Sequence, residues 1–477
     1  MTIFTLREAA ALIPGAIVEG DENVAFDRVS TDSRTAAAGD LFVAVKGDRF
    51  DAHDFLTQVA GRGASAALVS RMPAGSDGSI GSLPVIKVKD TRAALGALAH
   101  GWRKRFTMPL VAVTGSNGKT TVKEMIASIF AAAVGEAARM ATVGNFNNDI
   151  GLPLTLFRLN ATHRLAVVEL GMNHPGETEV LGRIAAPTVA VVNNAQREHQ
   201  EFMATVEAVA LEHASVIHAL GETGTAVFPA DDAYASIWRV AATGNPIIDF
   251  ALSDDPSKAA VTGRIAGTNV EITTPEGLLT VALRVLGEHN ARNALAATAA
   301  ALAASVSLDA IRRGLEAFEP VKGRLQVKRA ALAPIEGATV IDDTYNSNPD
   351  SMRAAIDVLA AQPSPRVLVM GDMGEVGDQG PAFHREVGAY AAERGIDALL
   401  ALGDASADSA KSFHAASNRS AKHFTDAAAL IAAVTHAGFG PGATFLVKGS
   451  RFMQMERVVD AVTSPQQPAA GVAPAAH

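Results

Sequence analysis

The sequence predicts an α/β protein of several domains whose sheets are mostly parallel. Its 477 residues exceed one ordinary core and suggest roughly three domains. Apolar runs of strand length alternate with helical patterns, which is typical of parallel sheets covered by helices. One of these runs leads into a glycine-bounded loop and then a helix, the order found at phosphate-binding loops.

Composition narrows the possible functions. A hydrophobic content of 48% with 19% charged residues suits a globular chain, and a net charge of −9 argues against a nucleic-acid groove. The absence of cysteine excludes disulfides, thiolate metal sites and thioester catalysis. Residues 1–14 lack a signal-peptide pattern, and no apolar run is long enough to span a membrane, so we expect a soluble cytoplasmic protein.

The first 107 residues are predicted to form a small mixed domain. Buried strands are expected at residues 41–45, 66–69 and 85–88, because each is a short apolar run. A helical pattern over residues 92–106 follows and leads to Pro109.

A central domain is expected from residue 108 to 318. Strands are expected at residues 110–113, 165–170 and 188–193, and the last two should be covered on both faces. Helices are expected after the glycine loop, with Met125, Ile126 and Ile129 inward, and at residues 206–220 and 290–304. Residues 259–286 break the alternation and predict an antiparallel hairpin of strands 270–274 and 278–285.

A third, smaller α/β domain is expected over residues 319–461. Its predicted strands are residues 339–342, 366–370, 398–402 and 444–448, separated by helical segments. The remaining residues, 462–477, are rich in Pro, Gln, Ala and Gly and are predicted to be a disordered tail without chemistry.

The most informative segment is Thr114-Gly-Ser-Asn-Gly-Lys-Thr-Thr121. Gly115 and Gly118 let backbone N–H groups close around phosphate oxygens, and the helix N-terminus adds partial positive charge. Lys119 supplies a full charge, and a threonine hydroxyl can reach Mg²⁺. The segment therefore predicts binding of a nucleoside triphosphate. Its first glycine comes two positions later than in the usual phosphate loop, which disfavours generic GTPases and kinases.

Polar residues follow two of the central strands. Glu169 ends one of them, where ligands of α/β sheets gather, and its carboxylate suits Mg²⁺. His199 follows the next strand; it could be a metal ligand, but a lone histidine equally suits a surface or core position.

Further polar groups permit two interpretations each. The segment with Asn147, Asn148 and Asp149 suits a polar ligand, but turn chemistry explains it equally well. Asn290 opens a helix, and its spacing alone favours a simple N-cap. Segments 342–349 and 448–451 place carboxylates, amides and cations at strand ends, where 448–451 suits an anionic substrate. Segments 31–34 and 46–54 are either binding loops or plain surface.

Together these runs resemble the Mur ligase family, the ATP-dependent amide-forming enzymes of peptidoglycan synthesis. The resemblance spans residues 1–461. It is carried by the phosphate-loop segment and by four further motifs: Asn147-Asn-Asp-Ile-Gly-Leu-Pro153, His289-Asn-Ala-Arg-Asn293, Asp343-Thr-Tyr-Asn-Ser-Asn-Pro349 and Lys448-Gly-Ser-Arg451. It implies the family's three-domain architecture, with a central P-loop-type, mostly parallel sheet and a C-terminal Rossmann-like domain.

The resemblance also implies roles for individual residues. The catalytic residues would be Lys119, Glu169 and His199. The ligands of Mg²⁺ would be Thr120, Glu169 and His199. ATP contacts would come from the phosphate loop, the helix that follows residue 287 and the third domain: Gly115, Ser116, Asn117, Gly118, Lys119, Thr120, Thr121, Asn290, Asn293, Arg324 and Asp343. Substrate contacts would come from all three domains: Ser33, Arg34, Lys46, His53, Asn147, Asn148, Asp149, Lys448, Ser450 and Arg451.

The cofactors implied are ATP and Mg²⁺. The partners implied are the substrates UDP-N-acetylmuramoyl-tripeptide and D-alanyl-D-alanine. We expect no nucleic-acid partner, no integral membrane segment and a monomer. The third residue of the tripeptide stays open between diaminopimelate and lysine. One departure concerns a lysine that many family members carry as a carbamate. His213 or a neighbour stands at its position, and no lysine occurs between Lys123 and Lys258, so a carbamate is excluded there.

The reaction implied is activation of the precursor's carboxylate as an acyl phosphate, followed by attack of the dipeptide amine. The alternatives are a ligase that adds the third amino acid, a folylpolyglutamate synthase, a P-loop ATPase that performs mechanical or regulatory work, and a nucleotide sensor without activity. The last two do not require motifs in all three domains.

Overall fold

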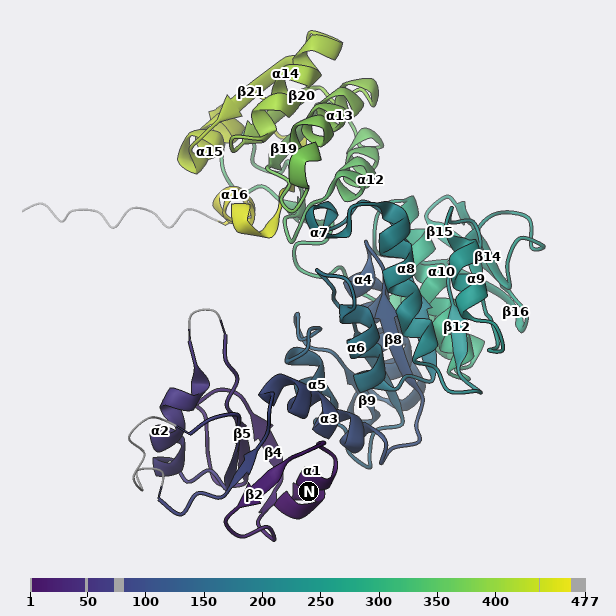
Figure 1. Ribbon diagram of the computed structural model, residues 1–477. Coiled ribbons are helices and arrows are strands. Elements are labelled where there is room, and N and C mark those ends of the chain that lie inside the picture. Colours follow the sequence, from purple (N-terminus) through teal and green to yellow (C-terminus); the bar gives the residue numbers. More distant parts are fainter. Residues whose placement is uncertain (1, 48–49, 73–80, 437, 465–477) are drawn as a thin grey trace, which may run out of the picture.

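The computed structural model describes residues 2–47, 50–72, 81–436 and 438–464. Its strands form five sheets, which the chain builds in order along an elongated molecule (Figure 1). We call the part with β1–β7 the N-terminal unit, the part with β8–β16 the central unit and the part with β17–β22 the C-terminal unit. The predicted disordered tail lies outside the described residues, apart from positions 462–464, of which 462 and 463 end a helix.

The N-terminal unit has a five-stranded sheet in the order β2-β7-β6-β5-β4 and a small β1-β3 pair. The three predicted strands are confirmed as β5, β6 and β7. Its elements are β1 (Phe4–Thr5), α1 (Leu6–Ala11), β2 (Ile17–Glu19), β3 (Ala25–Phe26), β4 (Arg28–Ser30), β5 (Asp40–Val43), η1 (Ala52–Phe55), α2 (Leu56–Gly61), β6 (Ala66–Val69) and β7 (Val85–Lys87).

The predicted helix before Pro109 is α3 (Thr91–Arg103), which joins two units. Asp90 caps its first turn by accepting from the N–H groups of Arg92 and Ala93. On one side Trp102 donates to the Leu159 carbonyl of the central unit at 3.2 Å. On the other side its ring lies 5.8 Å from that of Phe4. The helix therefore fixes the N-terminal unit against the central one.

The central unit is built on a five-stranded, wholly parallel sheet in the order β12-β11-β8-β10-β9. All residues of β8, β10 and β11 are buried, which confirms β10 and β11 as strands covered on both faces. Even and odd residues of β8 enter two separate cores, because alternate side chains point to opposite faces. The strands are β8 (Leu110–Thr114), β9 (Arg139–Ala141), β10 (Leu165–Glu169), β11 (Val189–Val192) and β12 (Thr225–Val227).

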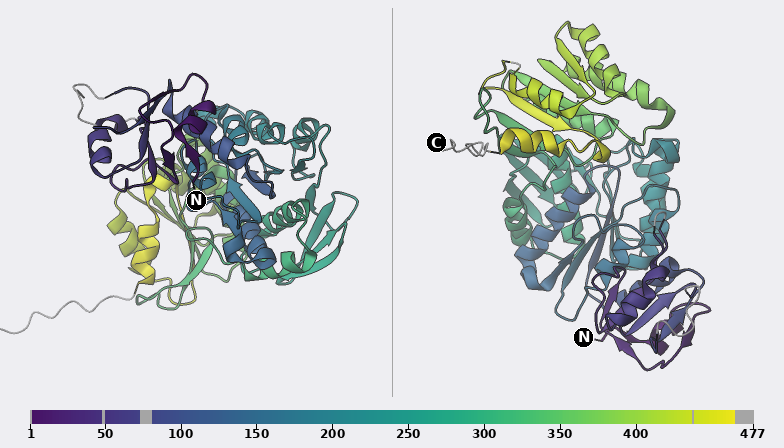
Figure 2. Two further views of the ribbon diagram at one scale, coloured as in Figure 1. Left: turned by 90° about the horizontal axis from the view of Figure 1, so that it is seen from below. Right: turned by 90° about the vertical axis from the view of Figure 1, so that its left-hand side faces the viewer.

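Helices cover both faces of that sheet (Figure 2). The predicted helices after the glycine loop and near residues 206–220 and 290–304 are confirmed as α4, α8 and α10. The helices are α4 (Lys119–Val134), η2 (Glu136–Ala138), α5 (Gly151–Leu156), α6 (Glu177–Ala185), α7 (Gln200–Met203), α8 (Val206–His218), α9 (Ala235–Ala241), α10 (Glu288–Ala303) and α11 (Leu308–Ala317).

A four-stranded sheet, β13-β14-β15-β16, extends the central unit. The predicted antiparallel hairpin is confirmed as β15 (Asn269–Thr274) and β16 (Gly277–Ala282), although β16 ends three residues earlier than expected. Two strands that the sequence did not indicate complete the sheet: β13 (Phe250–Leu252) and β14 (Val261–Ala266).

The C-terminal unit has a six-stranded sheet in the order β17-β18-β22-β19-β20-β21, parallel except for β17. All four predicted strands are confirmed as β18, β19, β20 and β22. The strands are β17 (Gln326–Arg329), β18 (Thr339–Asp343), β19 (Arg366–Gly371), β20 (Ala398–Leu402), β21 (Ser420–Phe424) and β22 (Thr444–Lys448). The helices are α12 (Pro349–Ala360), η3 (Gly377–Gln379), α13 (Gly380–Glu393), α14 (Ser406–Ser417), α15 (Ala427–His436), η4 (Arg451–Met453) and α16 (Glu456–Thr463).

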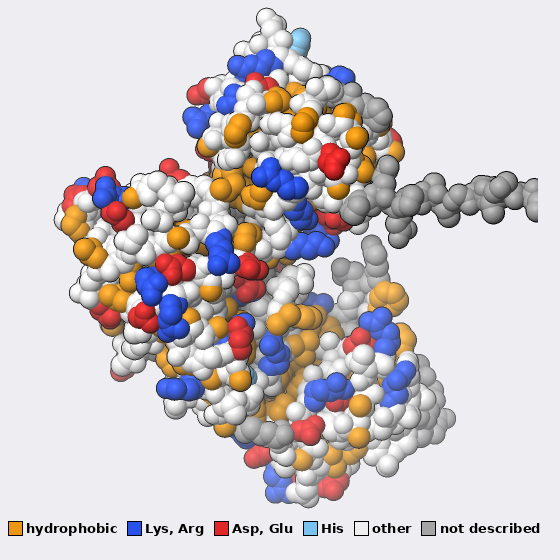
Figure 3. All heavy atoms as spheres, turned by 180° about the vertical axis from the view of Figure 1, so that it is seen from behind, with side chains coloured by type: hydrophobic (Ala, Val, Ile, Leu, Met, Phe, Trp, Pro, Cys, Tyr) orange, Lys and Arg blue, Asp and Glu red, His pale blue; other side chains and the backbone are white. Residues whose placement is uncertain are grey.

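Two sheets meet at one space between the central and C-terminal units. Segments that follow β8, β10 and β11 line it from below, and segments that follow β18 and β19, with Lys448 at the end of β22, line it from above. Seen from behind, the molecule is hollowed between the N-terminal and C-terminal units, with hydrophobic side chains on the floor (Figure 3). Among the described residues, no helix is long and apolar enough to cross a membrane.

Candidate active site

A cavity of about 1280 Å³ occupies the space where the sheets meet. Its walls come from the phosphate loop, the ends of β10 and β11, the first turn of α10 and the start of α12, with Arg92 of α3 at one edge. Ligands of α/β sheets bind at the carboxyl ends of the strands, and here two such ends face each other.

The phosphate loop joins β8 to α4 and depends on its glycines. Gly115 has φ +131°, and a Cβ there would come within 2.9 Å of the Asn193 backbone nitrogen. Gly118 is the N-cap of α4 with φ +81°, and a Cβ there would approach Asn293 Oδ1 to 2.6 Å. Both positions therefore exclude a side chain, and the backbone N–H groups at the start of α4 face the cavity as an anion site.

Asparagines that follow β11 hold the loop in place. Asn117 N–H donates to Asn194 Oδ1 at 2.9 Å, and Asn193 Nδ2 donates to the Asn117 carbonyl at 2.7 Å. The Asn117 side chain also pairs with Asn348 of α12, whose Nδ2 lies 2.9 Å from Asn117 Oδ1. The loop thus contacts the C-terminal unit directly.

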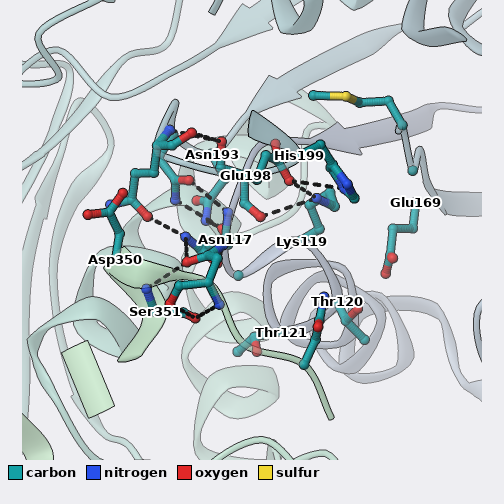
Figure 4. A pocket seen from close by; sticks show the side chains of 18 of the residues that line it. Asn117, Lys119, Thr120, Thr121, Glu169, Asn193, Glu198, His199, Asp350 and Ser351 are labelled. Atoms are coloured by element: carbon teal, nitrogen blue, oxygen red, sulfur yellow. Dashed lines mark hydrogen bonds and ion pairs between the residues drawn. The ribbon is translucent and has the colours of Figure 1, made fainter. Parts of the chain in front are cut away.

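Lys119 projects its ammonium group into the mouth of the loop (Figure 4). Its Nζ donates to the carbonyls of Gly115 at 2.5 Å and Ser116 at 3.2 Å, and to Glu198 Oε2 at 3.2 Å. Glu198 in turn lies 2.9 Å from His213 Nε2. Burial alone would raise the pKa of Glu198, but Lys119 and His213 outweigh it and lower that pKa to about 2.

Glu169 fits the magnesium site that the sequence suggested. Its side chain is almost wholly buried, with Oε1 accepting from Asn147 Nδ2 at 2.7 Å. Its other oxygen, Oε2, has no hydrogen-bond partner among the described residues. Mg²⁺ typically uses one or two carboxylates together with phosphate and water, so a single free carboxylate oxygen beside the phosphate loop suits it.

His199 lines the cavity and also contacts the C-terminal unit. It has φ +46°, and its Nδ1 lies 2.8 Å from Glu375 Oε2 of the C-terminal unit. This contact lowers the pKa of Glu375. In the described part of the chain, no three His, Asp or Glu side chains gather closely enough to hold a metal ion by themselves. His199 therefore connects two units in this structure.

The prediction that Asn290 caps a helix is wrong. Gly287 is the N-cap of α10 without a side-chain bond, and Asn290 Nδ2 donates to the Leu286 carbonyl at 2.7 Å from inside the helix. Asn293 Oδ1 accepts from Asn193 Nδ2 at 3.0 Å. Both asparagines line the cavity.

Residues of the C-terminal unit close the upper wall. Arg324 Nη2 donates to Thr120 Oγ1 at 2.8 Å, and its guanidinium lies 4.1 Å from the centre of the Tyr345 ring. Asp343 Oδ2 lies 2.7 Å from Lys448 Nζ. Arg324, Asp343 and Lys448 all line the cavity.

Two predicted substrate residues near β22 lie outside the cavity wall. Ser450 is buried behind it, donating to the Ser347 carbonyl at 2.9 Å and accepting from the Gly374 N–H at 2.8 Å. Arg451 is exposed and pairs with Glu456 at 2.9 Å. Ser450 and Arg451 therefore lie outside the cavity that Lys448 lines, although the three residues are close together in the sequence.

The predicted residues of the N-terminal unit are also outside the cavity wall. Arg34 binds Asp32 through two nitrogens, Ser33 lies beside it in a turn, and Lys46 is exposed. His53 is buried, with Nδ1 2.5 Å from Asp51 Oδ1 and Nε2 accepting from the Ser70 N–H. By contrast, the segment Asn147-Asn-Asp149 lines the cavity.

Sequence reasoning missed three residues that organise the site: Arg197, Glu198 and His213. Arg197 binds Asp350 of α12 at 2.6 Å and Glu386 of α13 at 2.7 Å. Hydrogen bonding to Glu386 and Asp350 raises the pKa of Arg197. The local signal for Arg197 and Glu198 was a cluster of charges, Arg197-Glu-His199, soon after a buried strand, where sheets of this type place their ligands. His213 was singled out only as the residue at the position of the family's lysine.

Three family models match consecutive parts of the chain. One described as "Mur ligase family, catalytic domain" matches residues 26–103, "Mur ligase middle domain" matches 113–301, and "Mur ligase, glutamate ligase domain" matches 323–451.

Whole-length relatives and solved structures agree. The UDP-N-acetylmuramoyl-tripeptide–D-alanyl-D-alanine ligase of Escherichia coli (strain K12) is 39% identical over 97% of this chain and 99% of its own. The ligase of the same name from Haemophilus influenzae is 38% identical over 92% and 94%. Crystal structure I of MurF from Acinetobacter baumannii superposes with a TM-score of 0.85 at 34% identity, covering 96% of this chain and 98% of that one. MurF from Thermotoga maritima in complex with ADP gives 0.77 at 25%, covering 91% and 96%.

Proposed function

The chain belongs to the Mur ligase family, and we propose that it joins D-alanyl-D-alanine to UDP-N-acetylmuramoyl-tripeptide at the expense of ATP. Its fold is the three-domain architecture of that family, as the sequence predicted. The observation that carries the proposal is the cavity itself. It places a phosphate loop, a free carboxylate oxygen and the cationic residues of the C-terminal unit around one volume.

ATP is assigned to the phosphate loop and the residues above it. The relative from Thermotoga maritima was solved with ADP, which supports a nucleotide here. We propose that residues 115–121 hold the phosphates, that Asn290 and Asn293 face the adenine side, and that Arg324 and Asp343 close over the nucleotide. The open N–H groups at the start of α4 and the ammonium of Lys119 suit triphosphate oxygens.

Mg²⁺ would be held by Glu169 and the hydroxyl of Thr120. The free Oε2 of Glu169 supports this assignment. When bound, the ion neutralises charge on the phosphates. His199 lines the same cavity, and we propose it as a further ligand of the ion through Nε2, with Glu375 orienting its ring through Nδ1.

The proposed reaction first activates the carboxyl carbon of the precursor, so that an amine can attack it. An oxygen of the precursor's terminal carboxylate attacks the γ-phosphorus, the bond to the bridging oxygen breaks, and ADP leaves with that electron pair. Lys119 lies at the loop where charge accumulates on the transferring group. The dipeptide amine then attacks the acyl carbon, the carbon–oxygen bond to phosphate breaks, and the amine loses a proton as the amide forms.

The remaining substrate contacts are proposals of the same kind. Asn147, Asn148 and Asp149 line the cavity on the side of the N-terminal unit, where the precursor's peptide would enter. Ser33, Arg34, Lys46 and His53 would hold its uridine diphosphate end. Lys448 faces the cavity, and we propose that it takes the dipeptide carboxylate together with Ser450 and Arg451, which follow it closely in the chain.

We assign precursor binding to residues 1–107, ATP binding to 108–318 and closure over the dipeptide to 319–461. We also propose a monomer that acts in the cytoplasm, where the nucleotide substrates are made. The central and C-terminal units form the cavity, with Arg92 of α3 at its edge, so a single chain can complete the site.

The test is ADP release from purified protein offered a panel of UDP-muramoyl precursors and amines. We expect ADP only when D-alanyl-D-alanine and a UDP-muramoyl-tripeptide are both present. Tripeptides ending in diaminopimelate and in lysine, compared side by side, identify the third residue. ADP formation with a single amino acid, or with a folate, in place of the dipeptide would assign the chain to a sister ligase instead. Hydroxylamine trapping during turnover should yield the hydroxamate of the acyl phosphate.

A further inference from the structure

Glu198 is a buried carboxylate to which the reaction above gives no role. It follows β11 and is 5% exposed. Its Oε2 faces Lys119 Nζ at 3.2 Å (Figure 4), and its Oε1 faces His213 Nε2 at 2.9 Å. His199 Nε2 lies farther away, at 3.9 Å from Oε2. A charge taken out of water is costly unless it is paired, so the site depends on both partners.

His213 gives that carboxylate a single orientation. It lies on α8 with its side chain fully buried, and its Nδ1 is 2.9 Å from Thr114 Oγ1. A carboxylate only accepts hydrogen bonds, so Nε2 must carry a proton. In the neutral ring, Nδ1 then accepts from the Thr114 hydroxyl. Both ring nitrogens are engaged, which fixes the ring in place.

The resulting series of contacts begins and ends at the phosphate loop. Thr114 is the last residue of β8 and directly precedes the loop. From it the contacts run through His213 and Glu198 to Lys119, whose Nζ returns to the Gly115 carbonyl at 2.5 Å. A lysine has a flexible four-carbon stem and a point charge without directional preference, so its position needs such support.

We propose that Glu198, oriented by His213, is a positioning residue that fixes the Lys119 ammonium at the phosphate loop. The transferring phosphoryl group then meets one conformer of Lys119. The inference rests on the proposed function only through the role of Lys119 in phosphoryl transfer.

Substitutions that change the hydrogen-bonding groups of Glu198 and His213 distinguish a positioning role from a contribution to packing alone. Glu198→Gln keeps the volume and removes the charge that attracts Lys119. His213→Leu can neither donate to Glu198 nor accept from Thr114, whereas His213→Gln can do both through its amide. Asp40→Asn is the matched control, because Asp40 is another buried carboxylate in an ion pair, with Arg28, remote from the cavity.

The experiment measures kcat and KM for ATP, the melting temperature, and the rate at which an amine reagent modifies Lys119 in the nucleotide-free protein. Misplacing a catalytic group by about 1 Å costs on the order of 100-fold, so E198Q and H213L should lower kcat roughly 10- to 100-fold, with KM changed far less. H213Q should recover most of the loss seen in H213L. E198Q should expose Lys119 to faster modification, and D40N should alter the melting temperature without altering kcat.

An unchanged kcat in E198Q would overturn the inference. So would equal losses in H213Q and H213L that follow the melting temperature, since that result describes packing alone. Failure of the wild-type protein to form ADP from the proposed substrates would instead refute the proposed function. In that case the rate of Lys119 modification still tests the positioning role of Glu198, because equal rates in wild type and E198Q would exclude that role.

Discussion

Lys119 is held at the phosphate loop by three contacts. Two backbone carbonyls and one carboxylate accept from its ammonium. Of the other cations that line the cavity, Lys448 pairs with Asp343, Arg292 with Asp231 and Arg92 with Asp149, whereas Arg324 contacts Thr120. Lys119 is the cation that the phosphate loop and the first turn of α4 carry themselves, which is why we propose it for the phosphates.

Lys119→Ala should abolish most ligation. Removing one group that stabilises charge in the transition state costs about 100- to 1000-fold in kcat, and we expect a loss of that order in ADP release. The melting temperature should fall, because Glu198 loses one of its two partners, but the fold should persist through the contact of Glu198 with His213. Circular dichroism checks the fold, and Lys411→Ala, which removes an exposed lysine, is the control. Retained ligation in K119A would exclude the phosphate role.

Asp51 organises the loop around His53 in the N-terminal unit. Burial would raise its pKa, but hydrogen bonds from His53 and Arg71 outweigh burial and lower the pKa to about 2. A lowered carboxyl pKa stabilises the fold above the ordinary value near 4, and the contribution is lost as the pH falls toward about 2.

Asp51→Asn should therefore destabilise the protein at neutral pH by about 1 kcal/mol, since it removes charge from hydrogen bonds while keeping a side chain able to cap η1. The difference in melting temperature from wild type should shrink as the pH is lowered from 7 to 3. Asp54→Asn, at a mostly exposed partner of Arg71, should show a smaller effect. A difference that grows toward acid pH would contradict the assignment.

At the scale of elements, helices and strands were predicted correctly where the local sequence carries a strong signal for them. Strands buried on both faces, such as β8 and β20, are continuous apolar runs and were found. The missed strands are of two kinds. Some are short, such as β9 with three residues, and others are polar edge strands, such as β21, whose residues are largely exposed. Their pairing comes from neighbours in the sheet, which local sequence does not record.

Helix α12 combines capping with contact to the phosphate loop. Asn348 Oδ1 accepts from the Ser351 N–H at 2.8 Å, while Nδ2 donates to Asn117 Oδ1 at 2.9 Å. Asparagine and aspartate cap helices about equally well, but aspartate has no hydrogen to donate.

Asn348→Asp should therefore keep the melting temperature within a few degrees, because aspartate still caps the helix. It should raise KM for ATP several-fold, because aspartate cannot donate to Asn117. Asn348→Ala should lose both, with an added destabilisation of about 1 kcal/mol. Thermal melts and ATP titrations of the two variants test this. Equal KM values in N348D and wild type would show that the contact with Asn117 does not position the nucleotide.

At the scale of the whole molecule, Arg197 is the main charged contact between the central and C-terminal units. Its guanidinium binds Asp350 and Glu386 together and lies 5.1 Å from the centre of the Phe383 ring. Next to it, His199 reaches Glu375 of the same unit. The segment that contacts the phosphate-loop lysine thus also holds the upper wall of the cavity.

Arg197→Met should weaken the closed arrangement. Hydrogen bonds to charged groups contribute about 1.5–3 kcal/mol each, so KM for ATP and for the dipeptide should rise roughly tenfold or more. Small-angle scattering should show a larger radius of gyration. Arg385→Met, which removes an exposed ion pair with Asp408 inside the C-terminal unit, is the matched control. Unchanged KM values and scattering in R197M would show that other contacts hold the units together.

The sequence by itself determined the fold class, the phosphate loop and most buried strands, because apolar periodicity and glycine placement act over a few residues. Only the tertiary structure decided that Lys119 meets Glu198, 79 positions away, and that Arg197 meets Asp350, 153 positions away. It also decided that His53 is buried while Lys448 faces the cavity. Such pairings depend on how strands are ordered and how units are packed, and those distances along the chain leave no local signal.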